Sequence, residues 1–105
     1  MRFKGREIIN MFDEELLDEI IDEINTREKY SMDLNMSMSA YIFNFLSQKS
    51  REFGMVTLDM LKKEPYKTQY INEFKNHIIN HNKINKDKKE YILERYIPLL
   101  LKDEW

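Results

Sequence analysis

Two histidines, the only ones in the chain, have the spacing of a metal-binding pair. His77 and His81 are four residues apart in a predicted helix, and Glu73 lies one turn earlier. Imidazoles at this spacing share a helix face and can hold a transition-metal ion. In the metalloprotease pattern with this spacing a glutamate directly follows the first histidine, and here Ile78 stands in that place. No cysteine or third histidine completes a ligand set, so we predict no metal site.

Covalent and acid–base catalysis also lack their usual groups. The chain has no cysteine, neither histidine has a neighbouring serine, and two glycines cannot build a glycine-rich phosphate loop. Seven carboxylates crowd residues 13–23, but they line the polar side of a predicted helix, where nothing separates their pKa values. They are interpreted as a solvent-exposed face or as a surface for a basic partner. We therefore predict that the protein is not an enzyme and uses no cofactor.

Lysines gather around the two loops that flank a helix predicted to open at Thr68. Tyr66 and Tyr70 are interleaved with them and could stack on a base or bond to a phosphate. Lysines near helix ends suit contacts with a nucleic-acid backbone, although they also serve simply to keep a protein soluble. Both interpretations stay open. The lysines are Lys62, Lys63 and Lys67 before the helix, and Lys83, Lys86, Lys88 and Lys89 after it.

Methionine is abundant, with seven residues in 105, and Met32, Met36 and Met38 lie close together. Clustered methionines can form an adaptable binding surface, but they more often fill a core. We expect these three to be core residues.

Length and composition indicate a single domain of mainly α-helical structure. A chain of 105 residues with 42% apolar and 34% charged residues can bury one core and stay soluble. Two glycines and two prolines allow few sharp turns, which favours helices. The longest apolar runs are far shorter than the roughly 20 residues of a membrane span. With no secretory signal and no cysteine, we expect a cytoplasmic protein.

Charge divides the chain into an acidic front and a basic rear. Residues 1–46 carry five basic and ten acidic side chains, and residues 47–96 carry eleven basic and seven acidic ones. A basic surface attracts phosphate, whereas an acidic one repels it or attracts a basic protein.

The first half, residues 1–54, is predicted to hold one strand and two helices. Residues 2–12 alternate between a mostly basic and polar face and a mostly apolar one, which is typical of a strand. Asp13 then caps a helix, and Ser37 or Ser39 caps a second one that ends at Gly54. Phe43 points away from the apolar face of the second helix, so we expect that helix to pack on two sides. The apolar positions are Leu16, Leu17, Ile20, Ile21 and Ile24 in the first helix, and Met38, Tyr41, Ile42, Phe45, Leu46 and Phe53 in the second.

The second half, residues 55–105, is predicted to be helical, although residues 55–56 could be extended. Thr57 caps a short helix over 58–63 that ends before Pro65. The helix from Thr68 presents Tyr70, Ile71, Phe74, Ile78 and Ile79 on its apolar face. Asp87 and Glu90 form a capping box for the last helix, which Pro98 kinks or ends. The fold class is therefore mainly α, with one short strand and about five helices.

Residues 2–50 resemble the ribbon-helix-helix family of plasmid regulation, partition and mobilisation proteins. The resemblance is carried by the runs 9–20 and 35–46, the second with a Ser-x-Ser step before an aromatic–isoleucine pair. It implies a homodimer whose paired strands enter the major groove of double-stranded DNA, while the start of the second helix grips a phosphate. The groove contacts implied are Lys4, Arg6, Ile8 and Asn10, and the phosphate clamp is Ser37 with Ser39.

A second arrangement would also bind DNA. Residues 46–63 could form a helix-turn-helix, with Gly54 at the turn and Thr57 opening the recognition helix. The leading hypothesis is thus a small DNA-binding protein of plasmid or phage type that regulates transcription or assists replication, partition or transfer. The alternative is a phage or mobile-element protein that binds a host protein through its acidic helix and its aromatic and methionine surface.

Overall fold

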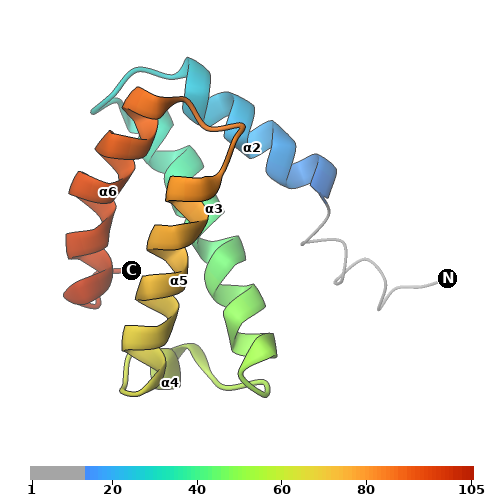
Figure 1. Ribbon diagram of the computed structural model, residues 1–105, viewed down its shortest axis with the longest axis vertical. Coiled ribbons are helices and arrows are strands. Elements are labelled where there is room, and N and C mark those ends of the chain that lie inside the picture. The colour runs from blue at the N-terminus through green and yellow to red at the C-terminus, as the bar shows by residue number, and fades with distance from the viewer. Residues whose placement is uncertain (1–13) are drawn as a thin grey trace, which may run out of the picture. The chain divides into compact units, whose positions relative to one another are not determined.

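The computed structural model describes residues 14–105 (Figure 1), and within them it is helical, with no strand. The mainly α prediction is confirmed, while the strand predicted over residues 2–12 lies outside the described part of the chain. The chain divides into two compact units, Met1–Asn44 and Phe45–Trp105, with the division inside α3. The helices are α2 (Glu14–Thr26), α3 (Met32–Glu52), α4 (Leu58–Leu61), α5 (Tyr66–Asn80) and α6 (Lys86–Leu101).

In the first unit, α2 buries the isoleucine stripe that its sequence predicts. Ile20, Ile21 and Ile24 are buried, because positions i, i+1 and i+4 share one helix face. Leu16 and Leu17, one turn earlier, are more exposed. The stripe therefore sets the inward side of α2, while Asp18, Glu19 and Asp22 are exposed.

The start of α3 corrects the sequence prediction. The helix begins at Met32, so Ser37 and Ser39 lie inside it and cap nothing. Ser31 is the cap, because its hydroxyl accepts the Leu34 N–H at 3.0 Å. The polar stretch before it has no regular spacing of apolar residues. A prediction from that spacing alone therefore places the start of α3 several residues too late.

The connections of the second unit follow the predicted turn residues. Gly54 has a φ of 97° and its N–H donates to the Arg51 carbonyl at 3.1 Å, which ends α3 as predicted. Thr57 caps α4 by accepting the Met60 N–H at 3.1 Å, again as predicted. Pro65 follows a cis peptide bond, and α5 begins at Tyr66, two residues before the predicted start.

The core of the second unit lies mainly between α5 and α6. Phe74 on α5 is fully buried and meets Phe45 edge-to-face at 5.1 Å between ring centroids. Ile79, which the sequence places on the apolar face of α5, is instead 52% exposed. One prediction about α6 is also wrong, because its N-cap is Asn85 and not Asp87. Of the two predicted effects of Pro98, an early end does not occur, since the helix runs through Pro98 to Leu101. The other buried apolar residues of α5 and α6 are Tyr70, Ile71, Ile78, Tyr91, Ile92, Tyr96, Ile97 and Leu100.

Candidate functional site

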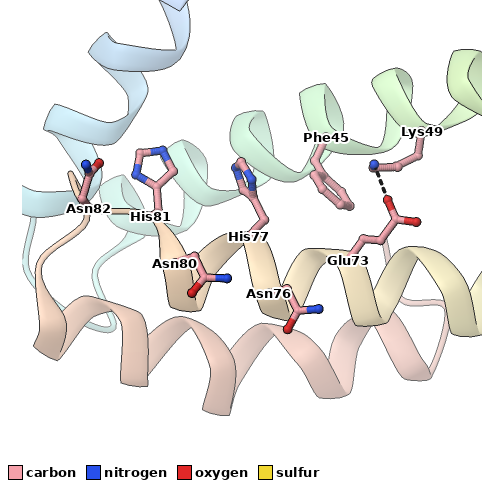
Figure 2. A pocket seen from close by; sticks show the side chains of 8 residues that line it. All are labelled: Phe45, Lys49, Glu73, Asn76, His77, Asn80, His81 and Asn82. Carbon is pink, nitrogen blue, oxygen red and sulfur yellow. Dashed lines mark hydrogen bonds and ion pairs between the residues drawn. The ribbon is translucent and has the colours of Figure 1, made fainter.

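An open pocket of about 500 Å³ with mainly polar lining residues lies beside α5 in the second unit (Figure 2). Residues from successive turns of α5 line it, and the last two turns of α3 supply one aromatic ring and one cation. In Figure 2 the two imidazole rings lie on the same side of α5 as the Phe45 ring. The lining residues are Phe45, Lys49, Glu73, Asn76, His77, Asn80, His81 and Asn82.

An ion-pair network lies at one end of this pocket. The Lys49 ammonium bonds to Glu52 at 2.8 Å and to Glu73, and Gln69 donates to the other oxygen of Glu73 at 3.2 Å. Burial works to lower the pKa of Lys49, but its hydrogen bonds to the two carboxylates outweigh burial and raise it. The hydrogen bond from Lys49 in turn lowers the pKa of Glu73. Lys49 and Glu73 therefore stay charged near neutral pH.

The two histidines lie at the middle and the far end of the pocket. Their ring centroids are 5.3 Å apart, and the His77 ring lies 5.8 Å from that of Phe45. Burial lowers the pKa of His77, with further contributions from the positive charges of His81 and Lys49. His81 Nδ1 accepts the Lys83 N–H at 3.2 Å. Within residues 14–105, no three histidine, aspartate or glutamate side chains are grouped to hold a metal ion. The pocket instead offers imidazole and amide groups for hydrogen bonding.

The predicted phosphate clamp is not at a helix start. Ser37 is buried in α3, and its hydroxyl donates to Glu23 Oε1 at 2.8 Å. Ser39 is exposed, also inside the helix. Backbone N–H groups in a helix interior already bond to carbonyls of the preceding turn, so neither serine offers the unpaired N–H groups that bind phosphate at a helix N-terminus. The predicted groove residues Lys4, Arg6 and Asn10 lie outside the described residues.

The predicted helix-turn-helix has its turn but not its second helix. Gly54 and Thr57 occupy the expected places, yet α4 has only four residues, about one turn. A recognition helix must present residues from several turns to base edges, which α4 cannot do.

Two of the three predicted DNA-binding lysines contact the last residues of the chain. Lys67 pairs with the Asp103 carboxylate at 3.3 Å, and the Lys62 ammonium lies 4.8 Å from the centroid of the Trp105 ring. The indole N–H of Trp105 donates to the Tyr70 hydroxyl at 3.0 Å. Lys63 is exposed. We call Lys62, Lys67 and Tyr70 the lysine cradle. Its contacts with residues 103–105 join segments that are too far apart in the sequence for a local pattern to predict them.

The clearest exposed apolar feature lies on α3 in the first unit. Met32 is 74% exposed, Met36 65% and Phe43 51%. With exposed Ala40 they occupy positions i, i+4, i+8 and i+11, so they form one line, which we call the α3 stripe. The sequence prediction that these methionines are core residues holds for Met38 and is wrong for Met32 and Met36.

A small hollow of about 210 Å³ adjoins the α3 stripe beside Met36 and Ala40. Glu23 and Asp33 border it, and Arg27 bonds to Asp33 at 3.4 Å across it. Its volume suits a single side chain, since pockets for small-molecule ligands start at about 300 Å³.

Comparison with known proteins gives no relative: no family model, curated protein or solved structure matches the chain. None of the helices within residues 14–105 combines the length and the apolar character that a bilayer crossing needs.

Proposed function

We propose that this chain is a non-enzymatic interaction protein that binds a basic, amphipathic helix of another protein on the α3 stripe. The observation that carries the proposal is the exposure of Met32, Met36 and Phe43 in one line. Exposed apolar patches of this kind are typical of interaction sites, and methionine adapts its shape to a partner. One residue in three of the chain is charged, yet residues 34–48 contain no charge, which fits the depletion of charge at the centre of interfaces.

The charge around the stripe favours a basic partner. Residues 14–44 carry two basic and eight acidic side chains. A partner helix that covers the stripe with its apolar face would meet this acidic surface with basic side chains at its edges. A second copy of the chain would bring the same acidic charge to the interface, which disfavours it as the occupant.

A pair of model helical peptides tests this proposal directly. One peptide carries leucine on one face and lysine on the other, and its twin carries glutamate in place of lysine. We expect the lysine peptide to bind in a titration followed by anisotropy, with Met36→Glu and Phe43→Glu each weakening binding at least tenfold. Ile79→Glu is the matched control, since Ile79 is as exposed as Phe43 but lies outside the stripe.

Three results would contradict the proposal. Equal binding of both peptides, or equal loss in Ile79→Glu and Met36→Glu, would remove the stripe from consideration. Light scattering that shows a dimer of the wild type and a monomer of Met36→Glu would assign the stripe to a second copy.

DNA binding is the second candidate function, favoured by the position of Lys62 and Lys67. Both touch the same three-residue segment, 103–105, so they lie together on one surface. The second unit carries twelve basic and nine acidic side chains, a balance that favours phosphate binding. If duplex DNA binds there, log Kd should rise with log salt by roughly 0.9 for each phosphate contact, and Lys62→Gln with Lys67→Gln should reduce that slope.

A further inference from the structure

We propose that the lysine cradle is a binding site for a phosphate that carries an unpaired base, and that residues 103–105 occupy it as an internal substitute. This inference rests on nucleic-acid binding by the second unit and names the chemistry that this surface would recognise. It depends on the side chains that already fill the cradle.

The groups held in the cradle correspond to the parts of a nucleotide. Lys67 pairs with a carboxylate, an anion that a phosphate could replace with greater charge. Lys62 lies over the face of an indole, as it could over the face of a base. The Tyr70 hydroxyl accepts an indole N–H, and the Tyr70 and Trp105 rings meet edge-to-face at 6.2 Å. A base offers both an N–H donor and an aromatic plane.

The segment that fills the cradle is built in a way that favours its release. Asp103 has a φ of 59°, so its backbone is in the left-handed conformation. Glycine or asparagine usually takes this conformation at the end of a helix. It also places a carboxylate at the negative end of the α6 dipole, where an acid is disfavoured. The ion pair with Lys67 offsets both costs, and it is partly exposed, with Asp103 at 36%. A competing phosphate that pairs with Lys67 removes this offset, which favours release of the segment.

The chain contains one tryptophan, so displacement of Trp105 has its own optical signal. The probes are inorganic phosphate, a nucleoside 5′-monophosphate, a single-stranded oligothymidylate and a DNA duplex. We expect the monophosphate and the oligothymidylate to shift the Trp105 emission to longer wavelength with saturation. A stronger response to the oligothymidylate would identify a strand as the source of the phosphate, and an equal one a free nucleotide.

Substitutions separate the roles of the cradle and of the segment in it. Asp103→Asn relieves the backbone and removes the ion pair, so it should tighten binding several-fold. Lys67→Gln should weaken binding at least tenfold. Lys86→Gln is the matched control, because Lys86 is exposed at the start of α6, far along the chain from the cradle. Thermal melting checks that each variant folds.

The outcomes of this experiment are distinct from those for duplex binding. If duplex binds but Trp105 emission does not change and Asp103→Asn binds no tighter, the cradle inference is wrong and DNA binding survives. If the monophosphate and oligothymidylate shift the emission but duplex does not bind, the cradle stands without the duplex function. A shift as large with inorganic phosphate as with the monophosphate overturns recognition of a base, and no shift with any probe overturns the inference as a whole.

Discussion

His77 should make the stability of the protein depend on pH. Burial, His81 and Lys49 lower its pKa in the folded chain, so the folded state binds this proton more weakly than the unfolded state. The free energy of unfolding is then highest above the unfolded pKa of about 6.5 and falls as pH decreases below it. We expect urea unfolding at pH 7.5, 6.5 and 5.5 to show this decline, and His77→Gln to flatten it. The carboxylate of Glu73 titrates below this range, and equal slopes in wild type and variant would contradict the assignment.

The two serines first predicted to clamp a phosphate should differ in what they do for stability. Ser37 is buried and bonded to Glu23, whereas Ser39 is exposed on the same helix. Both gain helix propensity when replaced by alanine, so Ser39→Ala provides the baseline. Loss of a buried hydrogen bond costs about 1 kcal/mol, and Ser37→Ala should be less stable than Ser39→Ala by about that amount in urea unfolding. Equal stability of the two variants would show that the bond to Glu23 contributes nothing.

At the scale of the element, local chemistry predicted some features well and others poorly. The isoleucine stripe of α2, the left-handed Gly54 and the Thr57 cap depend on neighbours within one or two turns, and the sequence predicts all three. The start of α3 depends on Ser31, which lies in a polar stretch without apolar period. The spacing of apolar residues also cannot distinguish a buried methionine from an exposed one. The sequence therefore predicted Met32 and Met36 to be core residues like Met38.

The candidate sites show the same limit more strongly. The i, i+4 pair of His77 and His81 is visible in the sequence because α5 alone brings the rings together. The lysine cradle is not, because Lys67 and Asp103 are 36 positions apart and meet only when the second unit has folded. Sequence analysis therefore found the lysines but not the residues that hold them.

For the whole molecule, the separation of charge predicts how copies of the chain attract one another. Residues 1–44 carry five basic and ten acidic side chains, which gives the first unit a net charge of −5. Residues 45–105 carry twelve basic and nine acidic ones, which gives the second unit a net charge of +3. At low ionic strength the acidic unit of one molecule should attract the basic unit of another. Salt should screen this attraction, because the Debye length falls from about 30 Å at 0.01 M to about 10 Å at 0.1 M. The interaction parameter from dynamic light scattering should therefore be negative at 0.01 M salt and rise toward zero or above by about 0.3 M. Attraction through the α3 stripe would behave in the opposite way, because apolar association is not screened by salt. An attraction that persists at 0.3 M and disappears in Met36→Glu would assign self-association to the stripe and not to the charges.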